Sequence, residues 1–197
     1  DITLTDYTPM DIVLNTFDGN GHTITIESFA PFTDQEINAG LFREIYEGMV
    51  VMNLTVNYRS IGYGIGDYSL GHVEKGVSSF SVDYADICNS TDTVIDYESA
   101  YFGAIASVNN GIITNCKSAG TIALSASTLE EKASNNYEIA FYIGGLVAVN
   151  GSTGYITNST SGLDIFALAN IGGVAYENQG KIASTVYDAT GDFENTN

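Results

Sequence analysis

The chain has 197 residues, of which 24 are acidic and only six basic, so its formal net charge is −18. Hydrophobic residues make up 44% and charged residues 15%, a balance that predicts a folded domain with a continuous core rather than a disordered chain. Nucleic acids and anionic lipids are not expected as partners, because phosphate binding needs clustered Lys and Arg, and no apolar run approaches the roughly 20 residues of a membrane span.

Residues 1–16 are predicted to form an N-terminal strand or cap, and residues 17–24 then read FDGNGHTI. Asp and Asn alternate with glycine there, as in calcium loops, but such a loop needs further oxygen ligands and a closing glutamate. The sequence returns to a strand pattern at Thr23, so a tight turn with positive φ at glycine is predicted instead. His22 and His72 lack the spacing of a zinc pair, and no metal site or cofactor is expected.

A glycine-centred phrase begins at residues 40–42 (GLF) and continues through Gly48 to a strand at residues 51–56. A weaker copy surrounds Gly76. The clearest copies follow at residues 101–120, 142–162 and 170–186. Intervals between equivalent glycines are 28, 35, 43 and 26 residues, which indicates a minimal coil of about 26–28 residues enlarged by insertions on one face.

The three clear copies align position by position. The aligned sets are Gly103, Gly144 and Gly172; Ile105, Leu146 and Val174; Asn109, Asn150 and Asn178; Gly111, Gly154 and Gly180; and Ile113, Ile156 and Ile182. A unit that cannot bury its own apolar face must stack on its neighbours. The alignment therefore predicts internal columns of like residues, among them an aliphatic ladder of the three isoleucines.

Each unit contains strands of three to five residues, and no sustained 3.6-residue period favours helices. Hairpins turning at Asn110-Gly111 or Asn150-Gly151 would give a sandwich, the structural alternative. The alignment of like with like favours parallel stacking. We predict an all-β fold: one domain, a right-handed parallel β-helix of about five to six coils, with coils over residues 17–186 and a tail at residues 187–197.

Three segments depart from the repeat and are predicted insertions. Residues 59–68 form a Gly/Tyr-rich loop whose Tyr63 and Tyr68 are candidates for contact with a partner. Residues 89–92 form a polar turn. Residues 127–132 (STLEEK) resemble a capping box that opens a short helix.

The repeated phrases resemble the GLUG motif of secreted and surface proteins. The likeness covers about residues 17–186, from the lead-in FDGNGHTI through Gly40-Leu41-Phe42 to the last copy; Gly103-Ala104 departs from the usual glycine pair. The resemblance implies a β-helical extracellular scaffold, as in adhesin stalks and the non-catalytic regions of some surface proteases. It brings no catalytic residues.

Cys88 and Cys116 lie 28 residues apart, close to one repeat length. Stacked strands are about 4.8 Å apart, so a disulfide between neighbouring coils is geometrically possible. The repeat register, however, places Cys88 about seven positions later in its coil than Cys116, so free thiols remain the alternative.

Four N-glycosylation sequons occur, at Asn53, Asn89, Asn150 and Asn158. Asn53 and Asn158 occupy the Asn position of the repeat, where stacking in a turn is the simpler role. Asn89 and Asn150 lie in predicted loops and are the better candidate acceptors.

No catalytic constellation stands out. Polysaccharide hydrolysis needs paired carboxylates, and the candidate groups are Asp83, Asp86, Asp92, Asp96 and Glu98, in a segment more typical of a solvated surface. Polysaccharide lyases need clustered basic residues, which are scattered here. The chain is therefore not expected to be an enzyme.

The leading prediction is a non-enzymatic extracellular or cell-surface structural protein, either a filament subunit or a stalk. Residues 187–197 offer little to cover the last coil, and an uncovered solenoid end exposes backbone and core. The expected partners are further copies, head to tail, or neighbouring domains of a longer chain. The alternative is an adhesin-type module that binds glycans through Tyr63 and Tyr68, and a third is a polysaccharide-cleaving enzyme.

Overall fold

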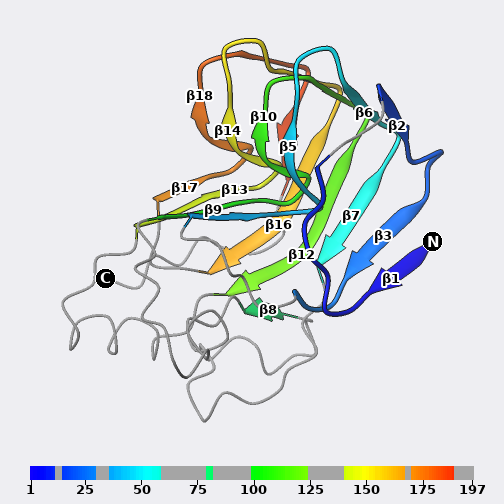
Figure 1. Ribbon diagram of the computed structural model, residues 1–197, viewed down its shortest axis with the longest axis vertical. Coiled ribbons are helices and arrows are strands. Elements are labelled where there is room, and N and C mark those ends of the chain that lie inside the picture. The colour runs from blue at the N-terminus through cyan, green and yellow to red at the C-terminus, as the bar shows by residue number, and fades with distance from the viewer. Residues whose placement is uncertain are drawn as a thin grey trace.

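The fold was examined in a computed structural model. It describes residues 1–11, 15–29, 36–58, 79–81, 99–123, 140–166 and 170–188. Within these ranges the regular elements are all β-strands, and every strand pair is parallel. Figure 1 shows them as stacked sheets in which strands from distant parts of the sequence lie side by side. The all-β prediction is confirmed for the described residues.

The strands form four sheets, which we number in the order in which the chain meets them from β4 onward. Sheet 1 contains β4 (Glu36–Ala39), β9 (Ser99–Gly103), β13 (Ala140–Gly144) and β17 (Asn170–Gly172). Sheet 2 contains β5 (Phe42–Ile45), β10 (Ala106–Asn109), β14 (Val147–Asn150) and β18 (Ala175–Asn178). Sheet 3 contains β2 (Thr16–Asp18), β6 (Val50–Met52), β11 (Ile112–Thr114), β15 (Tyr155–Thr157) and β19 (Lys181–Ala183). Sheet 4 contains β1 (Ile2–Leu4), β3 (Thr23–Ile26), β7 (Thr55–Tyr58), β8 (Ser79–Ser81), β12 (Lys117–Ala123), β16 (Thr160–Phe166) and β20 (Val186–Tyr187).

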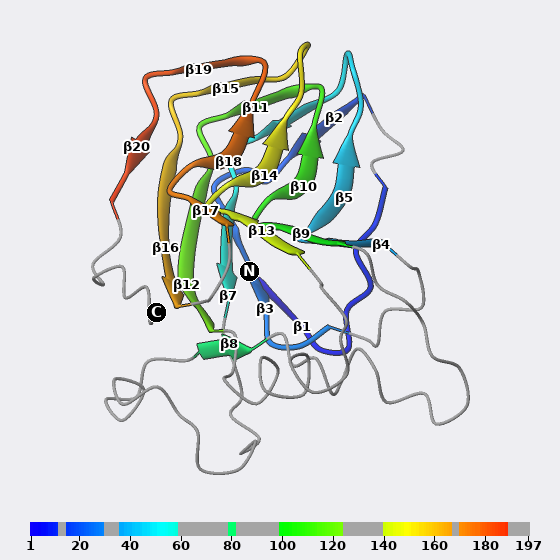
Figure 2. The same cartoon turned by 90° about the vertical axis from the view of Figure 1, so that its left-hand side faces the viewer.

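The chain passes through sheets 1, 2, 3 and 4 and then returns to sheet 1, one strand further along. We call each passage a rung: rung 1 is β4–β7, rung 2 is β9–β12, rung 3 is β13–β16 and rung 4 is β17–β20, while β1–β3 precede rung 1. Figure 2 shows β20, β16, β12 and β7 in succession along sheet 4. This arrangement is compatible with a parallel β-helix.

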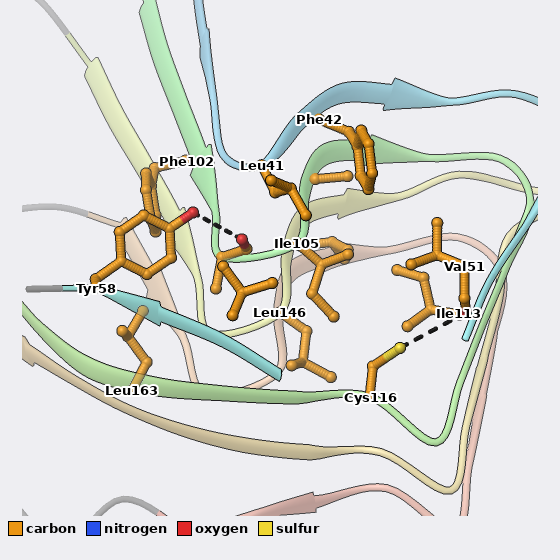
Figure 3. Close-up of a cluster of buried hydrophobic side chains, with 14 of the residues drawn as sticks. Leu41, Phe42, Val51, Tyr58, Phe102, Ile105, Ile113, Cys116, Leu146 and Leu163 are labelled. Carbon is orange, nitrogen blue, oxygen red and sulfur yellow. Dashed lines mark hydrogen bonds between the residues drawn. The ribbon is translucent and has the colours of Figure 1, made fainter. Parts of the chain in front are cut away.

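Columns of like residues fill the space between the sheets. In sheet 3, Ile113 pairs with Ile156, and Ile156 pairs with Ile182, as the repeat alignment predicts. Val51 and Phe17 continue the same column towards the N-terminus. Figure 3 shows a second column at the corner between sheets 1 and 2, where Leu41, Ile105 and Leu146 point into the same core.

The turns between sheets also repeat their conformation. Gly103, Gly144 and Gly172 are register partners, and a Cβ at Gly144 would overlap the carbonyl oxygen of Val147, so only glycine fits this close corner. At the corner between sheets 3 and 4, Asn53, Asn115 and Asn158 have φ values of 54°, 52° and 48°. Asn tolerates this left-handed region better than most residues, which explains its recurrence at that corner.

The enlarged intervals between repeats all fall at one corner. The chain between sheets 4 and 1 spans residues 59–98 after β7, residues 124–139 after β12 and only residues 167–169 after β16. The other corners of rungs 1 to 4 take two to four residues. The strands that bracket these segments thus lie in the same two sheets, while the face on which the insertions lie stays a prediction.

Among the described strands no rung lies between rungs 1 and 2, where the sequence interpretation placed the unit around Gly76, and this corrects that interpretation. β5 pairs directly with β10 and β6 pairs directly with β11, so no further rung lies between rungs 1 and 2. β8 instead lies beside the end of β12: Gly120 pairs with Tyr58 and the next residue, Thr121, pairs with Ser79. The predicted loops at residues 59–68 and 89–92, and the predicted helix at residues 127–132, lie outside the described residues.

The sheet 3 column predicts that truncating a side chain in its middle lowers the free energy of unfolding more than truncating one at its end. Ile156→Ala should lower the free energy of unfolding by about 3 kcal/mol, because Ile156 is fully buried between two neighbouring rungs. The matched variant Ile182→Ala should cost about 1 kcal/mol, because Ile182 is only partly buried in the last rung. Urea unfolding of dilute protein measures both, and equal losses would contradict this account of the core.

Candidate functional site: the two ends of the stack

The C-terminal rung is less buried than the rungs before it. In rung 3, Leu146, Val147 and Ile156 are fully buried, whereas their counterparts in rung 4, Val174, Ala175 and Ile182, are only partly buried. The strands of rung 4 have partners on one side only among the described residues. Among the described residues, the core is therefore less covered at this end than in the inner rungs, and the strands of rung 4 form its edge.

The N-terminal end also carries exposed apolar side chains. Ile2 lies on β1, and Met10 forms a bridge to Phe42 of β5; their side chains are 55% and 50% exposed. On the C-terminal rung, Tyr176 and Val186 are 38% and 57% exposed. Four of the six large apolar residues exposed within the described part of the chain thus lie at one end of the stack or the other.

An aromatic cluster lies behind the N-terminal edge. The rings of Tyr7 and Phe29 are 6.2 Å apart, and those of Phe29 and Tyr58 are 6.3 Å apart. Burial raises the pKa of Tyr7 to about 12, although a backbone hydrogen bond from Met10 partly offsets this. The Tyr58 hydroxyl donates to the carbonyl oxygen of Ala104 at 2.7 Å, and burial raises its pKa well above the ordinary value. Both phenol groups therefore stay protonated at neutral pH, and their role is in packing and hydrogen bonding.

Asparagine amides form a buried ladder between sheets 2 and 3. Asn109 Nδ2 donates to Asn150 Oδ1, and Asn150 Nδ2 donates to Asn178 Oδ1, each at 2.8 Å. Asn109 Oδ1 also accepts from the backbone N–H of Gly111, which closes the turn. The ladder ends at Asn178, which is exposed on the last rung, with its Nδ2 group not bonded to any described residue.

A second ladder lies on the outside, between sheets 3 and 4. Asn115 Nδ2 donates to Asn53 Oδ1 at 2.7 Å, and Asn53 Nδ2 donates to Asp18 Oδ1 at 2.9 Å. The bond from Asn53, followed by one from the backbone N–H of Asn20, lowers the pKa of Asp18. Asn20 and Gly21 both have positive φ, so the predicted tight turn is confirmed. This ladder ends in a charged carboxylate at the N-terminal edge.

The structure reorders the candidate glycosylation sites. Asn150, preferred from the sequence, is fully buried with its amide engaged in the inner ladder, which leaves no room for a glycan in the folded chain. Asn53 is engaged in the outer ladder. Asn158 is exposed at the corner between sheets 3 and 4 and is the best placed of the three. Asn89 lies outside the described residues.

The remaining predicted site residues are mostly outside the described part of the chain. Cys116 is buried, its Sγ lies 3.3 Å from the carbonyl oxygen of Thr114, and burial raises the pKa of its thiol to about 11. Cys88, the proposed disulfide partner, is not described, so the bridge stays a prediction. Tyr63 and Tyr68 and the candidate carboxylates also fall outside: Asp83, Asp86, Asp92, Asp96 and Glu98.

Sequence reasoning missed an aromatic column in the outer angle between sheets 1 and 2. The rings of Tyr101 and Tyr142 are stacked 4.8 Å apart, and Tyr142 lies 4.8 Å from Tyr176. The contact between Tyr101 and Tyr142 joins two rungs within sheet 1, and the contact between Tyr142 and Tyr176 joins two rungs across the corner from sheet 1 to sheet 2. Ser107 Oγ donates to Asn38 Oδ1 at 2.7 Å, which joins rung 2 to rung 1 across the same corner. The signal in the sequence is a tyrosine two residues before Gly103 and before Gly144.

The described residues contain no group of three or more His, Cys, Asp or Glu side chains that could hold a metal ion. In the same part of the chain, no helix is long and apolar enough to cross a membrane. Comparison with known proteins found no matching family model, no similar curated protein and no similar solved structure. The resemblance to GLUG repeats therefore stays a prediction from the sequence.

The inner asparagine ladder predicts a specific stability loss. Asn150→Ala should lower the free energy of unfolding by about 2 kcal/mol, because it leaves the buried Nδ2 of Asn109 without its acceptor. Asn178→Ala, at the exposed end of the same ladder, is the matched control and should cost less than about 1 kcal/mol, because Asn150 Nδ2 keeps the carbonyl oxygens of Gly154 and Lys181 as acceptors at 3.4 and 3.5 Å. Denaturant titration of both variants checks this, and a negligible effect of Asn150→Ala would overturn the structural role given to the ladder.

Proposed function

We propose that the chain is a non-enzymatic structural protein whose copies join end to end into a filament or a surface stalk outside the cell. In this proposal the four sheets are the walls of a right-handed parallel β-helix. The repeated order of the sheets supports the helix, and crossovers between parallel strands are right-handed in nearly all proteins. The N-terminal strands and rungs 1 to 4 make up its five complete or partial turns.

The observation that carries the proposal is the exposure of apolar side chains at both ends of the stack. An edge strand is a template for pairing with another chain, and a repeat protein needs capping units if its ends are to face water. Here Ile2 and Met10 are exposed at one end, and Val174 and Ile182 at the other end are less buried than their counterparts in rung 3. The two ends differ from each other, so their contact is heterologous, and a heterologous contact that continues the stack along its own axis extends into a filament rather than closing into a ring.

The extracellular location rests on the sequence. A net charge of −18 keeps a surface protein soluble, and the exposed sequon at Asn158 fits a secreted chain. The non-enzymatic assignment rests on the scattered basic residues and on repeats that bring no catalytic groups. A long scaffold with an acidic surface is what these features support together.

The end-to-end proposal predicts that charge at an end blocks assembly, whereas charge on the side does not. Electron microscopy of concentrated wild-type protein should show filaments. Ile2→Asp should abolish them, because the joint would bury an unpaired carboxylate next to apolar side chains. Ile112→Asp adds the same charge at a residue that is 36% exposed on β11, which is paired on both sides in the inner rung 2, and it should leave the filaments intact. Dispersed wild-type monomers at every concentration would contradict the proposal.

A glycan-binding module is the second candidate, and one observation favours it. The two long segments between sheets 4 and 1 start and end at the same corner, and insertions on one face of a repeat protein often form its binding surface. The first of them carries Tyr63 and Tyr68, which lie outside the described residues.

Under this second candidate, the wild-type protein should bind defined oligosaccharides on a glycan array. Replacing both Tyr63 and Tyr68 by Ala should weaken binding at least about tenfold, because stacking on aromatic rings would be lost. Tyr46→Ala, on a different corner, is the control and should bind normally. Absence of any glycan signal from the wild-type protein would remove this candidate.

A further inference from the structure

The outward face of sheet 3 is uncharged in its middle and carries an opposite charge at each end. Val51, Ile113 and Ile156 point into the core, so the residues on either side of each point outward. Taken strand by strand from β2 to β19, the outward residues are Thr16 and Asp18, Val50 and Met52, Ile112 and Thr114, Tyr155 and Thr157, and Lys181 and Ala183. On this face β6, β11 and β15 present no charged side chain, in a chain that has 24 acidic residues.

This face is open to solvent along its whole length. None of its outward residues is buried, and Ile112 at its centre is 36% exposed. Figure 2 shows β19, β15, β11 and β2 side by side along the top of the view. Lys181 is exposed at one end, with its Nζ 5.0 Å from the centre of the Tyr155 ring, and Asp18 is exposed at the other end. The face is therefore an apolar strip between two charges.

The strip is complementary to itself. Sheet 3 has five strands, so β11 lies at its centre and β2 and β19 lie at its edges. A two-fold axis along β11 would set two copies face to face with their stacks running in opposite directions. Ile112 would then lie opposite Ile112 of the partner subunit, and Val50 would lie opposite Tyr155 of the partner subunit. The same patch serves both copies, as in the isologous interfaces of most dimers.

The two charges favour this orientation over the opposite one. With the stacks opposed, Lys181 faces Thr16 of the partner subunit, and Asp18 of the partner subunit lies about 7 Å further along the strand, within reach of a lysine side chain. The Asp18 carboxylate accepts hydrogen bonds from Asn53 and from the backbone N–H of Asn20, which favour its ionised form. With the stacks running in the same direction, each charge would instead approach its own equivalent, and like charges across an interface repel.

We propose that a second copy of this chain docks on the outward face of sheet 3, related to the first by a two-fold axis along β11. The face is about 20 Å long and three residues wide, which is less than the roughly 800 Å² per partner that a stable complex buries. A single pair therefore associates weakly. Copies joined end to end would repeat the contact and hold two filaments side by side. The pairing itself rests on sheet 3 alone and does not require the end-to-end function.

Sedimentation velocity tests the pairing in Ile2→Asp protein, in which contact between the ends is blocked. At high concentration and physiological salt, which screens charges beyond about 8 Å, this protein should show a reversible equilibrium between monomer and dimer. Adding Ile112→Asp should raise the dissociation constant at least about tenfold, because the axis brings two carboxylates together. Lys117→Asp, at an exposed residue of β12 in the same rung, is the matched control and should leave the equilibrium unchanged.

A mixing experiment tests the position of the axis. In the same Ile2→Asp protein, Ile112→Lys alone should also dimerise weakly, whereas a mixture of the Ile112→Asp and Ile112→Lys proteins should dimerise at least as tightly as the parent. Recovery requires residue 112 to face itself, and misfolded variants could not produce it. A parent that is monomeric at every concentration, an equilibrium unchanged by Ile112→Asp, or a mixture no tighter than its components would overturn the pairing.

Electron microscopy separates this inference from the proposed function. Ile112→Asp in the wild-type chain should leave single filaments, whereas wild-type filaments should lie in pairs. Wild-type filaments that are never paired would overturn the lateral contact and leave end-to-end assembly standing. A dimer of the Ile2→Asp protein together with a wild-type protein that forms no filaments would have the reverse meaning.

Discussion

The fold depends on the in-register pairing of parallel strands, which places each residue directly over its equivalent in the next rung. Neighbouring strands lie about 4.8 Å apart, so similar side chains contact each other along each column. Isoleucines meet isoleucines in sheet 3, and asparagine amides bond to asparagine amides between sheets 2 and 3. A slip of one residue would turn every inward side chain outward, so each column stabilises the register of all the others.

The same constraint makes the ends of the stack unlike its middle. A residue in an inner rung has an equivalent on both sides, but one at an end has an equivalent on one side only. At the N-terminal end, Tyr7, Phe29 and Tyr58 supply part of the missing packing through ring contacts. At the C-terminal end, the columns stop at Val174 and Ile182 with partial exposure. End-to-end assembly, as proposed above, would cover these partly exposed side chains with the N-terminal end of another copy.

Much of this pattern could be read from the sequence, because stacking makes equivalent positions chemically alike. The aligned glycines, asparagines and isoleucines of the three clear copies are register partners in the structure. The interpretation of the copy around Gly76 as a separate coil was wrong, because glycine and apolar residues at the repeat spacing do not determine whether a segment pairs in all four sheets. Only β8 of that segment is described, and it pairs in sheet 4 alone.

Other features could not be predicted from the sequence, because they depend on the angles at the corners between sheets. Asn150-Gly151 looks like a surface turn, yet the inner ladder buries the Asn150 side chain completely. The contact between Tyr142 and Tyr176 joins residues of different sheets, across an angle that no sequence period encodes. The packing of Tyr7 against Phe29 likewise joins segments whose sequences share no motif. Repeats specify the walls, whereas the angles between walls and the packing at the ends come from tertiary contacts.

The corner between sheets 4 and 1 has a consequence for how such a chain can change. The strands on either side keep their pairing whether three residues or forty separate them, as the segments after β16 and β7 show. Because the cost of closing a longer loop rises only slowly with length, this corner tolerates segments of very different size. It is therefore a natural place to graft a foreign peptide, which the periodic scaffold would display at regular intervals along its length.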